Sequence, residues 1–522
     1  MQPLAILNGL TVQTRKIIFA VIGAVMLIPI LMLGRPADKV DLSGAPIKSG
    51  GTLAQLRFDY ELGEASLGNV DPTSSAMSFG LLGFRGIVAS MLWQEADDLK
   101  SRKEFAKLQD KVDSIIQLQP HFKEVWKFQG WNLAFNVSAE CDDVKDRYKW
   151  VKNGAKFMVQ GTERNRKVPE LFWQTGFFFG NKLGTADEKE EYRRFFVSDP
   201  DETAEYFRRE DPSINPERKG NYLVARDWYL KTNALVDAGR EQHQMDSPLL
   251  LAYPYSALME HAIVIQEDGV QLEGLELATR DEILEALAAL SVDDPEKRKQ
   301  LDDAYKAWTD QCVKAWQTAH DEWVREYGQK QLTSTDGTKF FLDILEPRPG
   351  DQDPAQRDRE AISALAGEQG VEPQRVEFWR TMYRRTTNYP IRKQRCNFEQ
   401  LPEMAMARAN FTEGKRLYIN MQDFALARTY LLAGLEKMAV VIDRYDRADG
   451  SNGILIDEPD VIESIIKTQI LYVQSFVAER EPLPESFPLK DKIWDNPEPS
   501  IQAIKAQAMD AFQRIVSPAI TP

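Results

Sequence analysis

Cysteine and histidine are scarce in this chain, and their scarcity excludes several kinds of site. Only three cysteines occur among 522 residues, and Cys141, Cys312 and Cys396 lie far apart. An odd number at such distances does not predict a disulfide framework, even in an oxidising compartment. The four histidines form neither an H-E-x-x-H motif nor a set with paired cysteines, so no metal site is expected. They are His121, His243, His261 and His320.

Short catalytic motifs are also absent from the sequence. It contains no G-x-S-x-G elbow and no G-x-x-x-x-G-K-[ST] loop, which disfavours serine hydrolases and phosphate-loop nucleotide binders. Adjacent carboxylates such as Asp142 and Asp143 are frequent, but acidic residues more often serve helix ends than acid–base catalysis. We therefore assign no catalytic residue and no cofactor, and we do not expect an enzyme.

Positive charge is in deficit along the chain as a whole. Sixty-five lysines and arginines face 80 aspartates and glutamates, giving a net charge of −15, so nucleic acid is not an expected partner. The length suits two to four domains or one extended repeat array. Eleven tryptophans indicate helices packed through large aromatic side chains.

The longest uncharged run, residues 17–33, predicts a transmembrane anchor. As a helix it would span roughly 25 Å, just enough to cross a bilayer core. The run is longer than a typical signal-peptide core, and no A-x-A site follows it. A cleaved signal and a buried core helix are the alternatives. Arg15 and Lys16 favour a short cytoplasmic N-terminus, residues 1–16. We therefore expect a single-pass inner-membrane protein with its bulk in the periplasm.

A spacer of 34–75, rich in Gly, Pro, Ser and Asp, is expected to connect the anchor to a first helical region, 76–332. The apolar stretch Ala76–Trp93 could resemble a second membrane span. Arg85 at its centre argues against this, since a charge at mid-bilayer costs about 3 kcal/mol or more. The stretch therefore predicts a buried helix, with Gly80, Gly83 and Gly86 allowing a neighbour to approach.

Residues 104–160 carry the clearest helical periodicity. Glu104–Leu118 has apolar residues at three- and four-residue steps, and Pro120 ends that helix. A second helix follows with Val125, Trp126, Phe128, Leu133 and Phe135 on its apolar positions. A third is expected over Arg147–Gln160. Three helices in succession with short connections indicate an all-α fold.

This pattern resembles the tetratricopeptide repeat, a helix–turn–helix unit of 34 residues. Pro120, Trp126 and Gly130 match the proline, aromatic and glycine of that family, and Phe172 and Gly176 repeat the last two, 46 residues later. Leu108 and Ile115 stand where the family usually has alanine. A later segment has similar small and aromatic positions: Gly414, Tyr418, Phe424, Ala427, Tyr430, Gly434 and Leu435.

The resemblance implies an irregular, TPR-like α-solenoid behind the N-terminal membrane helix. The run LQPHFKEVWKFQGWNLAFNVS, with the later DRYKWVKNG, is also similar to a family of membrane-anchored helical-repeat proteins of planctomycetes and related bacteria. That resemblance implies no particular biochemical activity.

Further helices are expected along the middle of the chain, after an irregular insertion over 185–222. The last of them carries Trp308, Cys312, Trp316, His320 and Trp323 at helical steps, which predicts a core stripe rather than a ligand-binding face. Cys312 and His320 are two turns apart, too far to share one metal. The expected helices are Tyr222–Gln244, Ser247–Glu267, Ala278–Leu290 and Pro295–Tyr327.

A loop or linker over 333–374, with a short strand or helix, is expected to separate the first region from a second helical region, 375–522. The second region opens with a local reversal of charge, in which basic residues alternate with Phe378, Trp379, Tyr383 and Tyr389. Such a segment can pair with internal carboxylates, or form a docking patch for a protein partner or lipid head groups. The basic residues are Arg375, Arg380, Arg384, Arg385, Arg392, Lys393 and Arg395.

These observations predict a non-catalytic, membrane-tethered scaffold that binds protein or peptide partners through a helical surface. Two alternatives remain open from the sequence. One is an envelope enzyme on an α-helical toroid, acting on glycans through a carboxylate pair. The other is a lipid- or transport-associated subunit that uses the arginine-rich segment.

Overall fold

The computed structural model describes residues 85–240, 247–268, 295–343, 354–445 and 458–516, with a few isolated residues before them. Within these ranges the chain is all-α, as predicted: most helices are connected by short segments, with one irregular segment over 198–220 and one small hairpin. The expected anchor, 17–33, the spacer, 34–75, and the expected helix Ala278–Leu290 lie outside the described residues or almost entirely so.

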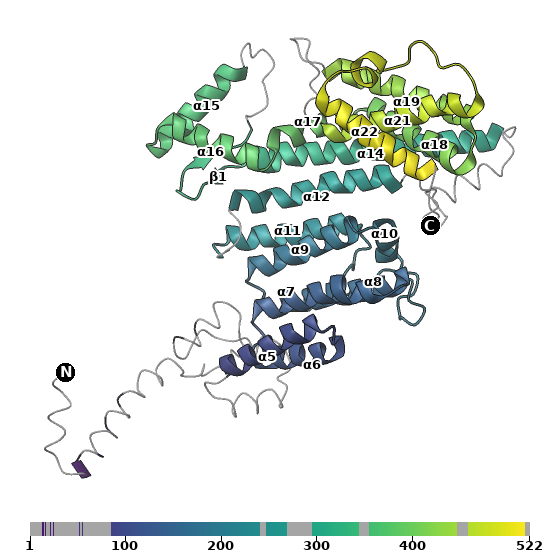
Figure 1. The fold of residues 1–522 in the computed structure, drawn as a ribbon. Coiled ribbons are helices and arrows are strands. Elements are labelled where there is room, and N and C mark those ends of the chain that lie inside the picture. The colour runs from purple at the N-terminus through teal and green to yellow at the C-terminus, as the bar shows by residue number, and fades with distance from the viewer. Residues whose placement is uncertain are drawn as a thin grey trace.

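The first helices are arranged in successive layers along the molecule (Figure 1). α5 and α6 lie at one end, followed by α7 with α8, then α9 with α11, and then α12. Each layer packs mainly against the helices next to it in the sequence. The elements are α5 (Arg85–Ser101), α6 (Phe105–Leu118), α7 (Lys123–Trp131), the π-helical η2 (Asn132–Val137), the short 3-10 turn η3 (Ser138–Glu140), α8 (Val144–Arg164), α9 (Pro169–Gly184), α10 (Lys189–Val197), α11 (Asn221–Asp237) and α12 (Ser247–Asp268).

The predicted periodicity of residues 104–160 is confirmed. α6 buries Leu108, Val112, Ile115 and Leu118, which places one apolar stripe against the layers beside it. The chain turns at Pro120, whose carbonyl oxygen accepts a hydrogen bond of 2.9 Å from the indole Nε1 of Trp126. The tryptophan therefore fixes the turn between α6 and α7 as well as filling the core.

Glycines allow the first layers to approach closely. A Cβ at Gly154 of α8 would lie 2.6 Å from the carbonyl oxygen of Gly130 on α7. At Gly176 on α9, a Cβ would lie 2.8 Å from the ring of Tyr229 on α11. Only a residue without a side chain fits at these contacts. Gly130 and Gly176 are two of the glycines at which the sequence resembles the repeat pattern.

The middle of the molecule is built around the long helix α14, which continues into the π-helical η4. Trp316 and Trp323 are fully buried there, together with Cys312 and Tyr327, so the predicted core stripe is confirmed. Around this stripe lie a two-stranded antiparallel hairpin and the helices that follow it. The elements are α14 (Pro295–Asp321), η4 (Glu322–Gly328), β1 (Leu332–Thr333), β2 (Lys339–Phe340), α15 (Pro354–Gln369), α16 (Pro373–Thr386) and α17 (Tyr389–Glu399).

The C-terminal helices form a further apolar core, over one end of α14 in Figure 1. Gly414 of α18 faces Leu431 of α19, and Gly434 of α19 faces Phe411 of α18, each at a distance that leaves no room for a Cβ. The elements are α18 (Pro402–Arg416), η5 (Leu417–Met421), α19 (Phe424–Tyr445), α21 (Pro459–Glu479), η6 (Lys490–Trp494) and α22 (Pro499–Val516).

Three expectations need correction or refinement. α5 does not form a wholly buried helix, because Ile87 and Met91 are 54% and 65% exposed while Ala89 and Ala96 are buried. Within the expected insertion 185–222, residues 189–197 form α10, an amphipathic helix that buries Tyr192 and Phe196. The segment 333–374 contains most of the hairpin, whose first strand begins at Leu332, and the 16-residue helix α15. α15 forms because proline is tolerated in a first helical turn and the alanines of the helix favour helical structure.

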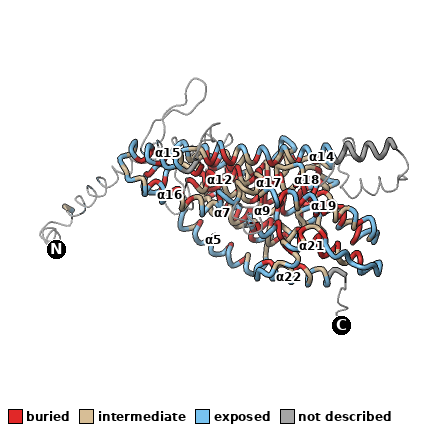
Figure 2. Tube along the Cα trace, turned by 90° about the horizontal axis from the view of Figure 1, so that it is seen from above, coloured by how far each residue is buried: buried red, intermediate tan, exposed pale blue. Residues whose placement is uncertain are grey.

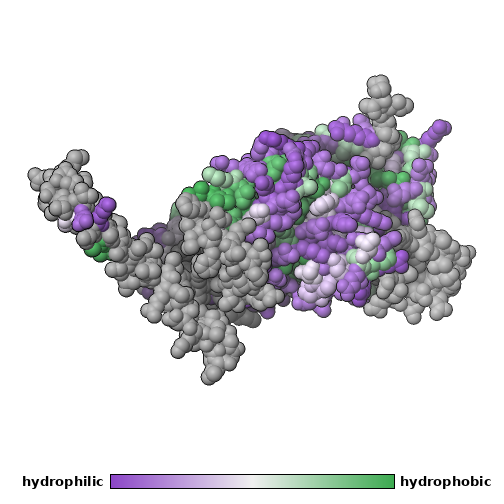
Figure 3. Space-filling view, turned by 90° about the horizontal axis from the view of Figure 1, so that it is seen from below, coloured by the Kyte–Doolittle hydropathy of each residue, from purple (hydrophilic) through white to green (hydrophobic). Residues whose placement is uncertain are grey.

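Buried residues follow the inner sides of the helices throughout (Figure 2), while the view from below shows a mostly hydrophilic surface (Figure 3). Of the described residues, only Pro248–Gln266 is both long and apolar enough to cross a membrane, and 56% of it is buried within the fold. Its contacts with α11 and α14 are those of a core helix.

Candidate functional site

The seven basic residues predicted as a patch lie on two consecutive helices, α16 and α17, but the structure divides them by their contacts. Four make ion pairs with acidic residues in the hairpin turn, just after the hairpin, in α15 and in α21. Arg375 pairs with Asp336 at 2.7 Å, Arg380 with Asp358 at 2.6 Å, Lys393 with Asp343, and Arg395 with Asp460 at 3.6 Å. The basic segment therefore ties together the hairpin, α15 and α21.

Three of the seven basic side chains, Arg380, Arg392 and Arg395, lie inside or along the core. Arg380 is only 2% exposed. The guanidinium groups of Arg392 and Arg395 each lie 5.9 Å from the ring centroid of a buried tryptophan, Trp323 and Trp316. Arginine over an aromatic face is stabilised by the ring quadrupole. This part of the predicted patch holds the fold together and is not a free surface.

Arg384 and Arg385 differ from the four ion-paired residues and from Arg392, which lies over the ring of Trp323. Neither forms an ion pair with any described residue, and Arg385 is exposed. Arg385 follows Phe378 by seven positions, which places both on one side of α16, two turns apart. The exposed part of the patch is therefore smaller than the sequence suggested and lies on α16.

An open notch of about 800 Å³ lies beside this exposed side of α16, between the hairpin turn and the α15–α16 connection. Its aromatic wall is formed by Trp379 and Phe378, whose rings meet edge to face at 5.3 Å. Phe378 is 60% exposed, which is unusual for a large aromatic side chain. The remaining lining includes Gln374, Arg375 and Asp336.

Asp336 organises the notch. Its carboxylate accepts hydrogen bonds from the hydroxyl of Ser334 at 2.5 Å, the backbone N–H of Thr338 at 3.0 Å and the indole N–H of Trp379 at 2.9 Å. Arg375 adds a bond of 2.7 Å. The hydrogen bond from Ser334, aided by those from Thr338 and Trp379, holds the pKa of Asp336 well below its usual value. The carboxylate is thus ionised at neutral pH and fixes the orientation of Trp379.

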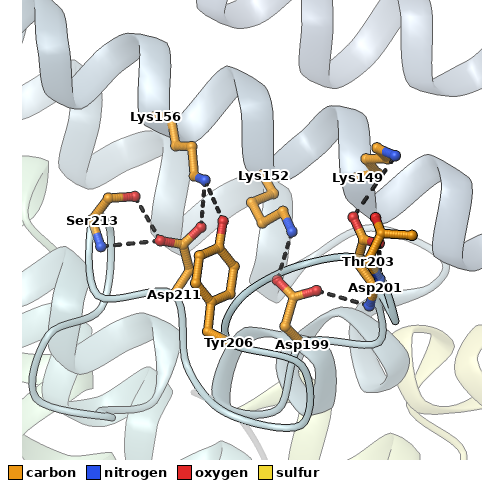
Figure 4. Close-up of polar contacts among 9 residues, drawn as sticks. All are labelled: Lys149, Lys152, Lys156, Asp199, Asp201, Thr203, Tyr206, Asp211 and Ser213. Carbon is orange, nitrogen blue, oxygen red and sulfur yellow. Dashed lines mark hydrogen bonds and ion pairs between the residues drawn. The ribbon is translucent and has the colours of Figure 1, made fainter.

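A second polar cluster joins α8 to the irregular segment 198–220 (Figure 4). Lys149, Lys152 and Lys156 project from one side of the helix toward three aspartates of the segment. Lys152 pairs with Asp199 at 2.6 Å, and the two side chains are 4% and 1% exposed. We call the three lysines of α8, together with their partners Asp199, Asp201 and Asp211, the lysine clamp.

The other two ion pairs of the lysine clamp differ in charge separation and in exposure. Lys156 reaches Asp211 at 2.6 Å and the hydroxyl of Tyr206 at 2.7 Å, whereas Lys149, 54% exposed, lies 3.7 Å from Asp201. Asp211 also accepts hydrogen bonds from the backbone N–H and the hydroxyl of Ser213, at 3.0 and 2.6 Å. The clamp therefore fixes the backbone of the segment as well as its side chains.

The charge states of the clamp indicate a structural role. Burial tends to lower the pKa of Lys156, but hydrogen bonds to Asp211 and Tyr206 outweigh it and raise that pKa. Burial tends to raise the pKa of Asp211, yet the bonds from Lys156 and Ser213 lower it. Both groups are thus charged at neutral pH and pair with each other, so Lys156 is not available there as a neutral amine nucleophile.

The lysine clamp and Asp336 were not predicted from the sequence. Lysines at i, i+3 and i+7 on α8 lie on one helix face, and that spacing is a usable signal. Asp143, by contrast, serves a helix end as predicted, since its carboxylate accepts from the backbone N–H of Lys145 at 2.7 Å at the start of α8.

Within the described ranges, no group of three His, Cys, Asp or Glu side chains is placed to hold a metal ion. The notch beside α16 combines an exposed aromatic residue, an ionised carboxylate and a nearby arginine without an ion pair to any described residue. Comparisons with protein-family models, with curated proteins and with solved structures find no match to this chain.

Proposed function

We propose that the chain is a non-catalytic scaffold, tethered to a bacterial inner membrane by residues 17–33, which binds a protein or peptide partner through a helical surface. In this proposal the helix pairs form an irregular, TPR-like α-solenoid. The bulk of the chain lies in the periplasm. Tethering raises the local concentration of whatever the surface binds.

The layered packing of α5 to α12 supports the solenoid part of the proposal. Helices adjacent in the sequence pack on each other, and Gly130, Gly176, Gly414 and Gly434 all lie at close helix–helix approaches. These are the small-residue positions that the tetratricopeptide-like pattern marks. A stack of this kind presents a long surface suited to extended partners.

The notch beside α16 is the observation that carries the binding part of the proposal. Protein interfaces concentrate their binding energy in aromatic and arginine side chains that become buried on association. Phe378 is exposed, Trp379 is held by Asp336, and Arg385 lies two turns further along without an ion-pair partner among the described residues. A partner segment with an apolar side chain followed by an acidic one matches this arrangement.

Site-specific photocrosslinking in membranes tests the proposal. A photoreactive phenylalanine analogue at Phe378 is expected to crosslink to a discrete protein partner. The same analogue at Val440, which is 47% exposed on α19, serves as the control and should give no such product. Crosslinks to lipid alone, or equal products from both positions, would contradict the proposal.

Carbonate extraction tests the tether separately. The full chain is expected to stay with the membrane fraction, and a chain beginning at residue 34 is expected to be released. Release of the full chain would remove the tether from the proposal without affecting the notch.

A further inference from the structure

The connection that follows α21, residues 480–486, is exposed at every position and is apolar at its centre. Its sequence is Arg-Glu-Pro-Leu-Pro-Glu-Ser, and the central Leu483 is 41% exposed. The two flanking prolines fix their own φ angles and disfavour helix in the residues before them, so this stretch stays extended. We call residues 480–486 the proline loop. It presents an apolar side chain on a short extended segment.

Both ends of the proline loop are fixed to the fold. Arg480 ends α21 with a φ of 58°, and the backbone N–H of Glu481 donates a hydrogen bond of 2.9 Å to the carbonyl oxygen of Phe476. The side chain of Glu481 pairs with Arg428 of α19. At the other end of the loop, Phe487 is buried. A loop held in this way loses little conformational entropy when a partner binds it.

Charged residues stand on either side of Leu483. Arg480 precedes it by three positions and Glu485 follows it by two, and neither side chain forms an ion pair with any described residue. In an extended chain, these charges lie roughly 9 Å before and roughly 6 Å after the apolar side chain. The proline loop therefore presents a positive, an apolar and a negative group in that order.

The notch beside α16 presents the opposite order of charges. Glu372 lines it at the start of the helix, Phe378 forms its aromatic wall, and Arg385 follows two turns later. Glu372 is exposed and, like Arg385, forms no ion pair with any described residue. Along the helix these two charges lie roughly 9 Å before and roughly 10 Å after Phe378. The other ionised carboxylate of the lining, Asp336, is already paired with Arg375.

We propose that the notch of one copy of the chain binds the proline loop of a second copy. This inference rests on the proposed binding function of the notch and names its partner. Leu483, with its flanking prolines, packs on the aromatic wall of Phe378 and Trp379, because grooves lined by aromatic side chains bind extended proline-rich segments. The loop also has the composition that matches the notch, an apolar side chain followed by an acidic one.

The charges set the direction of this contact. With the loop parallel to α16, Arg480 of one copy pairs with Glu372 of the other. Glu485 then pairs with Arg385. The spacings agree to within about 1 Å on the first side, and the long arginine side chain spans the remaining difference of about 4 Å on the second. In the reversed direction each charge meets one of its own sign, which complementary interfaces avoid.

The proline loop lies far from the notch of its own copy. Asp460 at the start of α21 pairs with Arg395 of α17 at 3.6 Å, and the loop leaves the opposite end of this helix, roughly 30 Å away. α16 and α21 also lie toward opposite sides of the molecule in Figure 1 and Figure 2. The contact is therefore made between copies. Because two different surfaces meet, it can continue from copy to copy as a row or close into a ring.

Photocrosslinking between two differently tagged forms of the full chain in one membrane tests the inference. A photoreactive phenylalanine analogue at Phe378 of one form is expected to capture the other form. Mass spectrometry should place the crosslink within residues 480–486. When both forms carry the analogue, products larger than a dimer are expected, since each copy can use its notch and its loop at once.

Charge reversal tests the pairing of the two segments. Arg385→Glu and Glu485→Arg should each lower the crosslinking yield about tenfold, because an exposed ion pair is replaced by two like charges. The double variant restores opposite charges in every contact and should recover most of the yield, which a folding defect could not do. Glu436→Arg is the matched control, since Glu436 is exposed on α19 outside the loop. It should leave the yield unchanged.

Three outcomes would overturn the inference, and they separate it from the scaffold proposal. Crosslinks from Phe378 to a different protein, with none to a second copy, would remove self-association and leave the scaffold proposal standing. Crosslinks to a second copy outside the proline loop, or a double variant as defective as the single ones, would exclude this mode of contact. Absence of any protein product from Phe378 would overturn both proposals.

Discussion

α8 and α16 both present basic side chains to acidic partners, yet they use them in different ways. On α8 the central pair, Lys152 and Asp199, is almost completely buried, and its partners come from one irregular segment. On α16, Arg375 is 54% exposed although it pairs with Asp336, and Arg385 has no acidic partner among the described residues. Charge content alone therefore does not distinguish a structural clamp from a surface available for binding. The burial of the ion pair distinguishes the two.

The largest expected effect is on the free energy of unfolding, which should fall more for a substitution on α8 than for one on α16. Lys152→Met leaves the carboxylate of Asp199 buried without a counterion, and loss of one partner of a buried pair costs about 3–5 kcal/mol. Urea unfolding should show this loss. Lys149→Met is the control on the same helix, since an exposed pair contributes about 0–1 kcal/mol. Arg375→Ala on α16 should behave like Lys149→Met. Equal destabilisation by all three would refute the distinction.

The next largest expected effect is on partner affinity, which should depend on α16 and not on α8. Phe378→Ala should weaken association with the crosslinked partner by about 2 kcal/mol or more, roughly 30-fold, as for an interface hot spot. Since Phe378 is 60% exposed, the free energy of unfolding should change little. Affinity measured with the isolated partner, beside urea unfolding of the same variant, checks both halves. Lys152→Met protein that remains folded should bind the partner normally.

Packing around the two regions also differs, and glycine substitutions sharpen the contrast. Gly154→Ala on α8 forces apart two helices whose backbones touch, so a loss of about 1–3 kcal/mol is expected from overpacking. A Cβ added at Gly367 on α15, beside α16, would meet no other atom within 4 Å. Gly367→Ala should therefore stabilise the protein by up to about 1 kcal/mol, because alanine favours helix. Thermal unfolding should show a lower midpoint for Gly154→Ala and a higher one for Gly367→Ala.

The smallest expected effect concerns pH. The pKa of Asp211 is lowered in the folded protein, because hydrogen bonds from Lys156 and Ser213 outweigh its burial. Its contribution to stability is therefore complete above the ordinary aspartate pKa of about 3.9 and is lost as pH falls through the lower, folded pKa. The pKa of Lys156 is raised, so its contribution is present below about pH 10.4 and lost at higher pH.

Urea midpoints measured between about pH 3 and pH 6 should fall less steeply on acidification in Asp211→Asn than in the unaltered chain. Asp201→Asn provides the comparison at the exposed end of the clamp. A pH dependence identical in the unaltered chain and in Asp211→Asn would show that Asp211 carries none of it.

Local pattern was sufficient to predict α6, α7, α14 and the core stripe, because helical periodicity depends on residues three or four positions apart. The lysine clamp pairs residues far apart in the chain, as in Lys152 with Asp199 and Lys156 with Asp211, and that pairing depends on the layered fold. Likewise, Arg375 and Arg380 were indistinguishable in the sequence, but their side chains are 54% and 2% exposed. Only the packing of α15 and the hairpin against α16 separates them.

The layered arrangement of α5 to α12 has a consequence for biogenesis. Because each helix packs chiefly on its sequence neighbours, little chain must be closed into loops before native contacts form, which favours rapid folding. Nascent segments can add one layer at a time as they emerge, and each new helix covers the apolar face of the preceding one. A nascent chain would thus shelter its apolar surfaces progressively, before its carboxyl end is made.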